Sequence, residues 1–294
     1  MGTLKIGWIG TGVMGAPMAG HLQAAGHEMH VFNRSKSKTE GLVGKGAVWC
    51  DSPAKVAESS DIVFTMVGLP SDVEEVYLGD QGIFSVQGPY RIVVDMTTSR
   101  PSLAKTIAQE ADGKGIESLD APVSGGDIGA KNAALAIMVG GKRETFDRVL
   151  PLFQLMGKNI SYMGVHGAGQ HTKVSNQILV AGNMIGACEA LLYAARLGLD
   201  QQAVIDIIGK GAAGSWAINN LGPRMVRGDY APGFLVEHFI KDMGIALAEA
   251  EAVGLSLPGL GLVHQLFVAV KAQGQERSGT QALYLALKVL NGER

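Results

Sequence analysis

The 294-residue sequence lacks the patterns that build disulfide frameworks, metal sites and serine hydrolases. Its two cysteines, Cys50 and Cys188, form no CxxC, so we expect two small buried thiols and a reducing compartment such as the cytoplasm. The seven histidines show no metal-ligand spacing and HExxH is absent, which predicts no metal site. No GxSxG stretch indicates a nucleophile elbow.

The sequence also lacks a large excess of positive or negative charge. The net charge is −2 and only 18% of residues are charged, so nothing indicates a nucleic-acid partner. The opening "MGTLKIGWIG" has no charged leader before a long apolar run, and we expect no signal peptide. The apolar stretch 178–199 is interrupted by Asn183, Glu189 and Arg196, which favours a buried helix of a soluble protein over a membrane span.

What the sequence has is a large apolar content, 47% of residues, arranged in two different rhythms. In 1–163, short β-branched runs alternate with helical patterns such as 14–25, which predicts an α/β domain with a mostly parallel sheet covered on both faces. The runs that we expect to be strands are 5–9, 28–32, 61–67, 91–96, 117–123 and 135–141.

After residue 164 the strand signal disappears, and 164–294 is predicted to be an all-helical domain. Within the expected helix 170–197, apolar residues of 174–195 cover almost the whole circumference. Such a helix lies inside a domain or a subunit interface, so we expect a homodimer or homotetramer. The other predicted helices are 201–210, 215–226, 235–253 and 258–273.

The first glycine-rich stretch, "KIGWIGTGVMG", contains a GxGxxG pattern. The pattern alone is a weak signal, but here it follows a strand, opens a helix and precedes a second strand, as in a dinucleotide-binding fold. Backbone N–H groups at the start of that helix would bind the pyrophosphate. The predicted cofactor loop consists of Gly10, Thr11, Gly12, Val13, Met14 and Gly15.

The end of the second strand bears on which dinucleotide is bound. An NAD site places Asp or Glu there, whereas this sequence reads "VFNRSKSK", with Asn33, Arg34 and Ser35 and no carboxylate until Glu40. A guanidinium and a hydroxyl suit a 2′-phosphate. We therefore predict NADP(H), with NAD(H) as the less favoured cofactor.

Two later strand ends are expected to border the cofactor, because ligands lie outside the carboxyl ends of parallel strands. In "MVGLPSD", Leu69 and Pro70 are candidates to pack near the ribose or nicotinamide. In "DMTTSRP", Thr97 or Thr98 is a candidate to hydrogen-bond near the nicotinamide.

Four stretches together resemble the β-hydroxyacid dehydrogenase family: "GWIGTGVMGAPMAGHLQAAGH", "DAPVSGGDIGA", "GAGQHTKVSNQ" and "HFIKDMGIALAEA". They occur in order along nearly the whole chain, which is far more specific than the glycine loop alone. The resemblance implies a Rossmann-type N-terminal domain, a long inter-domain helix and an all-helical C-terminal domain. It also implies an NAD(P)-dependent oxidoreductase.

The resemblance assigns roles to individual residues. It places the catalytic lysine at Lys173 and a supporting amide at Asn176. Where the family often has two adjacent asparagines, this chain has Asn176 and Gln177, so Gln177 is not predicted to be catalytic. The resemblance further implies a substrate-carboxylate loop at Ser124, Gly125 and Gly126, and cofactor contacts from 7–21, Thr98 and Lys241.

The residue chemistry agrees with these roles. Reduction of a carbonyl requires a proton donor within hydrogen-bond reach of the new alcohol oxygen, and Lys173 at a helix N-terminus suits that task. Asn176, at i+3, shares its helical face. The "SGG" turn presents N–H groups and a hydroxyl, which fit a carboxylate.

We therefore predict an NADPH-dependent enzyme that interconverts a small semialdehyde or 2-oxo acid with its hydroxyacid, of the 3-hydroxyisobutyrate, tartronate semialdehyde, glyoxylate or succinic semialdehyde type. The alternatives are an NAD-preferring dehydrogenase of the 3-hydroxyisobutyrate or L-serine type and a non-catalytic dinucleotide-binding protein. An imine reductase would usually replace the lysine. Trp216 is equally compatible with a pocket wall and with the core.

Overall fold

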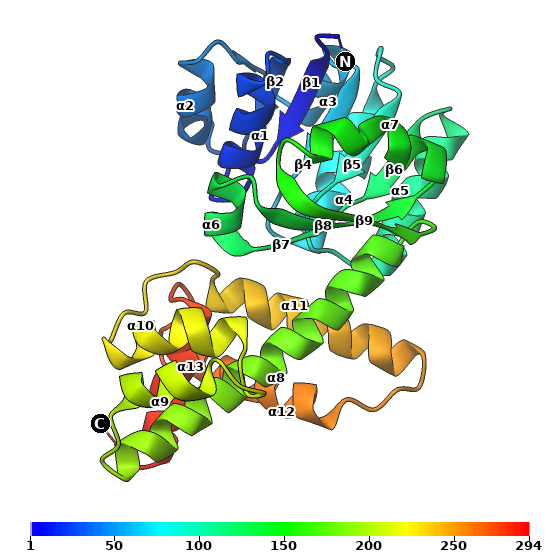
Figure 1. The fold of residues 1–294 in the computed structure, drawn as a ribbon. Coiled ribbons are helices and arrows are strands. Elements are labelled where there is room, and N and C mark those ends of the chain that lie inside the picture. Colours follow the sequence, from blue (N-terminus) through cyan, green and yellow to red (C-terminus); the bar gives the residue numbers. More distant parts are fainter. Residues whose placement is uncertain (1, 294) are drawn as a thin grey trace. The chain divides into compact units, whose positions relative to one another are not determined.

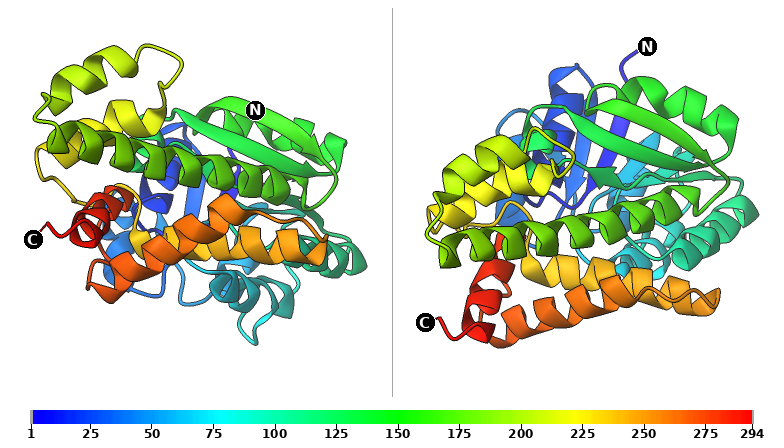
Figure 2. Two further views of the ribbon diagram at one scale, coloured as in Figure 1. Left: turned by 90° about the horizontal axis from the view of Figure 1, so that it is seen from below. Right: turned by 60° about the horizontal axis from the view of Figure 1, so that its bottom comes forward.

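The computed structural model describes residues 2–293, and packing divides the chain into two compact units, Met1–Lys173 and Val174–Arg294 (Figures 1 and 2). The predicted domains divide at 163/164, before the long helix, whereas the units divide inside that helix. Its first turns pack against the residues of the first unit. The two-domain assignment itself stays a prediction.

The first unit contains one nine-stranded sheet in the order β3-β2-β1-β4-β5-β6-β8-β7, with β9 paired to β8 (Figure 1). Strands β1 to β6 are parallel, and β8 runs antiparallel to β6. This is the predicted Rossmann-type, mostly parallel sheet. The strands are β1 (Lys5–Ile9), β2 (Glu28–Phe32), β3 (Val48–Trp49), β4 (Ile62–Thr65), β5 (Ile92–Asp95), β6 (Glu117–Asp120), β7 (Val123–Ser124), β8 (Leu135–Gly141) and β9 (Gly157–Gly164).

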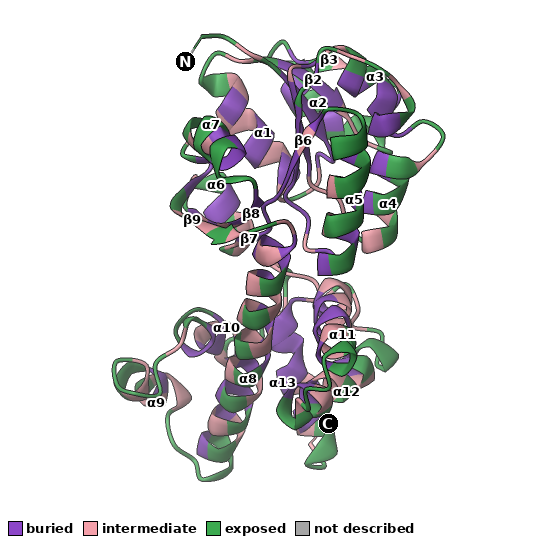
Figure 3. Cartoon of the chain, turned by 90° about the vertical axis from the view of Figure 1, so that its right-hand side faces the viewer, coloured by how far each residue is buried: buried purple, intermediate pink, exposed green. Residues whose placement is uncertain are grey.

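Alternate residues of a strand point to opposite faces of the sheet. Helices cover both faces, so both sets of side chains are buried. Trp8 and Phe64, whose rings stack with centroids 5.6 Å apart, pack with α1 and α7 on one face. Ile9 and Val63 pack with α3, α4 and α5 on the other face. Figure 3 shows the central strands coloured as buried. The helices are α1 (Gly15–Ala24), α2 (Glu40–Val43), α3 (Pro53–Glu58), α4 (Pro70–Leu78), α5 (Pro101–Gly113), α6 (Gly126–Lys131) and α7 (Arg143–Phe153).

The order of the strands reverses at β1: β2 and β3 are added on one side of it, and β4, β5 and β6 on the other. Open parallel sheets bind ligands at such a switch point, outside the carboxyl ends of the strands. The loops that follow β1 and β4 touch here, since a Cβ added at Gly10 would overlap the Met66 carbonyl oxygen. The fold therefore places the predicted glycine loop at the switch point.

Some predicted elements were wrong in extent. The run 117–123 is two strands, because the chain leaves β6 at Ala121–Pro122 and proline cannot donate to a ladder. Strands β3 and β9 were not predicted. The sequence of β9, "GKNISYMG", is polar because the strand lies at the edge of the pairing and is largely solvent-exposed. Cys50 and Cys188 are free and buried, as predicted.

The second unit is all-helical over its described residues, as predicted, around one apolar core. Helices α11 and α12 lie side by side in both views of Figure 2. Between these helices, the rings of Phe239 and Phe267 pack edge to face, with centroids 5.0 Å apart. The predicted helix 215–226 is a π-helical turn, Ala217–Leu221, followed by α10, and α13 was not predicted. The helices are α8 (Ala168–Arg196), α9 (Gln201–Ile208), α10 (Gly222–Val226), α11 (Val236–Ala252), α12 (Pro258–Ala272) and α13 (Leu283–Leu290).

Helix α8 is the one helix among the described residues that is long and apolar enough to cross a membrane by length and composition. The core helix of a soluble protein passes the same test. Its buried residues Ala181, Met184, Cys188 and Leu191 belong to the core of the second unit.

The start of α8 allows a sharp test of packing. A Cβ added at Gly169 would overlap the Met138 carbonyl oxygen and lie 2.6 Å from that of Asp120. We expect Gly169→Ala to lower the free energy of unfolding by about 1–3 kcal/mol, because the helix must shift away from the sheet. Chemical denaturation monitored by circular dichroism measures this change.

Gly182→Ala in the same helix is the matched control. A Cβ there would meet no atom within 4 Å. An alanine in an open helical position is expected to stabilise by up to about 1 kcal/mol. Equal effects of the two substitutions would contradict the close packing of the helix start.

Candidate active site

The glycine loop is held from two sides. Gly10 adopts φ +95°, a conformation that favours glycine, and its N–H donates to Phe32 O at 2.9 Å. The Thr11 N–H donates to Asn33 Oδ1 at 3.0 Å. The end of β2 therefore fixes the loop that follows β1.

This loop fits a pyrophosphate. A Cβ added at Gly12 would meet nothing within 4 Å, so the backbone there is open to a ligand. Helix α1 has no side-chain cap and no acidic residue in its first turn, which leaves its N–H groups and partial positive charge for an anion. Thr11 Oγ1 is buried and has no hydrogen-bond partner among the described residues. Val13 is exposed, and Met14 is partly buried against the core.

The residues predicted to recognise the 2′-phosphate have different surroundings. The Arg34 side chain is 88% exposed, and its Nη1 lies 3.3 Å from Asp72 Oδ1. Ser35 is exposed. Asn33, in contrast, uses its oxygen to hold Thr11 and its Nδ2 to donate to Ser35 O at 3.0 Å. Asn33 therefore supports the loop, while Arg34 is exposed but paired with Asp72 and Ser35 is exposed.

The ends of β4 and β5 are tied together beside this loop. The Val67 N–H donates to Thr97 Oγ1 at 3.0 Å, and the Thr97 N–H donates to Asp95 Oδ1 at 3.0 Å. Thr97 is buried by this structural task, whereas Thr98 is half-buried. Of the two predicted threonines, Thr97 is thus committed to joining the two strand ends.

Leu69 and Pro70 lie where the loop after β4 enters α4. Leu69 is 42% exposed, and its N–H donates to Asp72 Oδ2 at 3.0 Å. Pro70 is the first residue of α4. The carboxylate of Asp72 therefore links this helix start to Arg34 at the end of β2.

The predicted carboxylate loop follows β6 in the same sheet. Ser124 ends β7 and is half-buried, and α6 begins at Gly126. The nearest acid, Asp127, is paired with Lys131 Nζ at 2.9 Å. That pairing reduces the repulsion that an unpaired acid would exert on a substrate carboxylate beside Ser124, Gly125 and Gly126.

Lys173 lies in the second turn of α8 and is buried, with 6% of its surface exposed. The helix start is held by Asp120 at the end of β6. Its Oδ1 accepts the Gly167 N–H at 2.8 Å, and its Oδ2 accepts the Gln170 N–H at 2.9 Å. A carboxylate at a helix N-terminus accepts hydrogen bonds from the free N–H groups there and interacts favourably with the positive end of the helix dipole.

In the second unit, four polar side chains form a chain of contacts. Asn176 Nδ2 donates to Gln177 Oε1 at 2.7 Å, and Gln177 Nε2 donates to Asp242 Oδ2 at 2.6 Å. Lys241 Nζ lies 2.9 Å from Asp242 Oδ1. Gln177 and Asp242, neither of them predicted as site residues, therefore connect Asn176 to Lys241.

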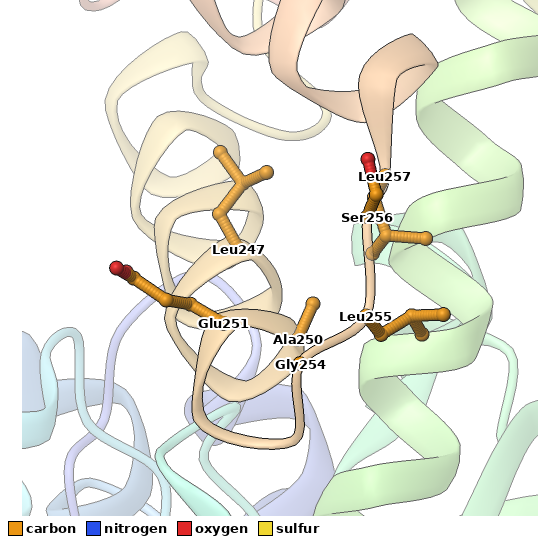
Figure 4. Close-up of a pocket in the computed structure, with 7 residues that line it drawn as sticks. All are labelled: Leu247, Ala250, Glu251, Gly254, Leu255, Ser256 and Leu257. Atoms are coloured by element: carbon orange, nitrogen blue, oxygen red, sulfur yellow. The ribbon is translucent and has the colours of Figure 1, made fainter.

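Two further features of the second unit, Trp216 and a surface hollow, lie outside this chain of polar contacts. Trp216 is 61% exposed, so it is not part of the core. A surface hollow lies at the turn between α11 and α12 (Figure 4) and contains none of the predicted site residues. It is lined by Leu247, Ala250, Glu251, Gly254, Leu255, Ser256 and Leu257.

Comparison with known proteins agrees with this arrangement. Residues 5–164 match the NAD-binding domain of 6-phosphogluconate dehydrogenase, and 167–287 match the NAD-binding region of NADP-dependent 3-hydroxyisobutyrate dehydrogenase. The chain is 53% identical over 279 residues to the uncharacterized oxidoreductase YkwC of Bacillus subtilis (strain 168), covering 95% of this chain and 97% of that protein. It is 40% identical to 2-hydroxy-3-oxopropionate reductase of Escherichia coli (strain K12), with 98% of each chain covered.

The chain belongs to the β-hydroxyacid dehydrogenase family. A solved structure of 3-hydroxyisobutyrate dehydrogenase from Mycobacterium tuberculosis, described with L-serine, superposes with a TM-score of 0.88 at 29% identity. It covers 98% of this chain and 100% of that one. This member of the β-hydroxyacid dehydrogenases is thus an NAD(P)-dependent oxidoreductase with a Rossmann-type sheet and an all-helical C-terminal region.

Some polar residues of this β-hydroxyacid dehydrogenase were missed by reasoning from its sequence. Asp120 and Gln170 lie inside two of the recognised stretches, but their partners are about 50 and 70 residues away. The only available signal was an acid and an amide at the edges of strongly apolar segments.

Asp120 predicts a pH-dependent stability. Burial raises the pKa of its carboxyl from 3.8 to about 6, against the effect of the Gly167 and Gln170 N–H groups. The folded state therefore binds more protons than the unfolded state between these values. Stability is gained as the pH falls through 6 and lost as it rises through 6.

We expect the free energy of unfolding to rise by about 1 kcal/mol between pH 7.5 and pH 5, relative to the variant Asp120→Asn. Urea denaturation of both proteins at the two pH values measures the difference. Parallel pH curves for the two proteins would contradict a raised pKa at Asp120.

Proposed function

We propose that the chain is an NADPH-dependent reductase that interconverts a small semialdehyde or 2-oxo acid with its hydroxyacid. The observation that carries the proposal is a buried lysine, Lys173, on a helix anchored to the carboxyl edge of a dinucleotide-binding sheet. A lysine is costly to bury without a task or partners. The reductase and dehydrogenase names of relatives across the whole chain support the same reaction class.

The proposed site assigns cofactor binding to the first unit. Residues Gly10 to Gly15 would hold the pyrophosphate through N–H groups, and Arg34 and Ser35 the 2′-phosphate. Leu69, Pro70 and Thr98 would border the nicotinamide end. The cofactor contact of Lys241, a residue of the second unit, stays a prediction from the family resemblance. The bound nicotinamide supplies or accepts the hydride.

The protein's own residues supply orientation and the proton. Ser124 and the N–H groups of Gly125 and Gly126 would bind the substrate carboxylate. Lys173 Nζ would donate its proton to the carbonyl oxygen during reduction and accept it back during oxidation. One N–H of Asn176 Nδ2 is used by Gln177, which leaves a second N–H and the oxygen. The oxygen would accept from the substrate hydroxyl or from the lysine ammonium.

We also propose that this enzyme is a cytoplasmic homodimer or homotetramer acting on a free small molecule. Two apolar side chains of α8, Leu179 and Tyr193, are 66% and 68% exposed in the single chain. A second copy that covers them would remove this apolar surface from water.

The proton-donor assignment is tested by Lys173→Met, which removes the ammonium but keeps most of the side-chain volume. We expect kcat to fall by about 10²–10⁴-fold, since a general acid contributes this much to proton transfer. Binding of NADP(H), measured by titration calorimetry, should be retained.

His171→Ala is the matched control, because His171 is an exposed residue of the same helical turn. Its activity should stay within about two-fold of the unmodified enzyme, as expected for a surface change. If Lys173→Met kept its activity, or if His171→Ala lost it, Lys173 would not be the proton donor.

The cofactor preference is tested by Arg34→Ala. Because a guanidinium binds a 2′-phosphate through charge-assisted hydrogen bonds, kcat/KM for NADPH should fall by about 10- to 100-fold. The value for NADH should change little. Lys38→Ala, which removes an exposed positive charge from the same turn, should leave both values nearly unchanged. A parallel loss for NADH and NADPH would assign Arg34 another role.

A further inference from the structure

Gln170 is a buried amide, with none of its surface exposed, one helical turn before Lys173. Both polar atoms of its side chain are used by a single loop. The Ser99 N–H donates to Gln170 Oε1 at 3.0 Å, and Gln170 Nε2 donates to Thr97 O at 2.7 Å. The loop follows β5, about 70 residues earlier in the chain.

These two hydrogen bonds enclose Thr98. One is made by the carbonyl before it and the other by the N–H after it, so the amide holds the backbone on both sides of this residue. Thr98 itself is half-buried, in contrast to Thr97 and Ser99. Gln170 therefore determines the conformation of the loop that the proposed function places beside the nicotinamide.

The main chain of Gln170 is held independently. Its N–H donates to Asp120 Oδ2, at the end of β6. The same residue is thus attached to the ends of two neighbouring strands, through its backbone to one and through its side chain to the other. All these groups belong to the unit Met1–Lys173.

We propose that Gln170 is a positioning residue, which sets Lys173 relative to the Thr97–Ser99 loop so that proton and hydride reach the same carbonyl group. The inference rests on the proposed function for the identity of the reaction. The amide serves both contacts at once, because its NH₂ group donates to Thr97 O while its oxygen accepts from the Ser99 N–H.

Gln170→Glu tests this requirement with almost no change in volume. The ionised carboxylate can still accept from the Ser99 N–H, but it places a second oxygen against Thr97 O, where a donor is needed. Because burial favours the protonated acid, which would donate again, the variant is assayed at the alkaline end of the activity range. We expect kcat to fall by about 10- to 100-fold, as for a small misplacement of reacting groups. The primary deuterium isotope effect with 4-deuterated NADPH should rise, because hydride transfer becomes rate-limiting.

A binding comparison separates positioning from general damage. The affinity for the preferred dinucleotide should fall by about tenfold, a factor equivalent to 1.4 kcal/mol. The affinity for the same cofactor without nicotinamide, ADP-ribose or its 2′-phosphate, should stay within about two-fold, which is below 0.5 kcal/mol.

Gln23→Glu is the matched control. Gln23 likewise joins two backbone groups through its side-chain amide, with Nε2 donating to Leu42 O at 3.1 Å and to Lys45 O at 3.0 Å, at the far end of α1. Its variant should keep kcat, the isotope effect and the nicotinamide-dependent part of the affinity.

The outcomes distinguish the two proposals. If the unmodified enzyme reduces no semialdehyde, the proposed function fails, and the binding comparison still decides the role of Gln170. A loss of affinity in Gln170→Glu that needs the nicotinamide supports positioning. An unchanged kcat and affinity, or an equal loss for the fragment and the dinucleotide, would overturn it.

Discussion

The carboxylate of Asp120 is the constraint on which the candidate site depends. It lies at the carboxyl end of β6 and accepts hydrogen bonds from the N–H of Gly167, just before α8, and from that of Gln170 in the first turn of α8. The close approach is possible because Gly169 has no side chain. These hydrogen bonds stabilise the buried Asp120 carboxylate. They also attach the start of the helix that carries Lys173 to the sheet.

The same edge of the sheet gathers the other parts of the site. Asn33 holds the loop after β1, and Thr97 links the loops after β4 and β5, each through one hydrogen bond. Gln170 binds the loop after β5 through two. Thr97 and Gln170 are buried, whereas Asn33 is half-buried. The loops are joined at these side chains, and the backbone at Gly12 is open to a ligand.

The sequence was most informative where its signal was local. Strands β1, β2 and β8 have the predicted bounds, because short apolar runs end at polar or glycine residues. The glycine loop was recognisable from its spacing between a strand and a helix. Family membership was predictable from four ordered stretches, and the comparisons confirm it.

Contacts between distant segments could not be read in this way. Nothing in "GAGQ" indicates that Gln170 binds the backbone around Thr98, or that Asp120 is its partner. The ion pair of Arg34 with Asp72 and the link of Gln177 to Asp242 likewise join elements 38 and 65 residues apart. Polar β9 was missed because an exposed edge strand lacks the apolar run of a buried one.

The central claim is that this β-hydroxyacid dehydrogenase reduces a small semialdehyde or 2-oxo acid with NADPH. The most direct measurement is cofactor oxidation, followed at 340 nm, with glyoxylate and with succinic, methylmalonate and tartronate semialdehydes, each repeated with NADH. The account predicts turnover of at least one of these substrates and a higher kcat/KM with NADPH. Turnover of none of them, or a preference for NADH, would contradict it.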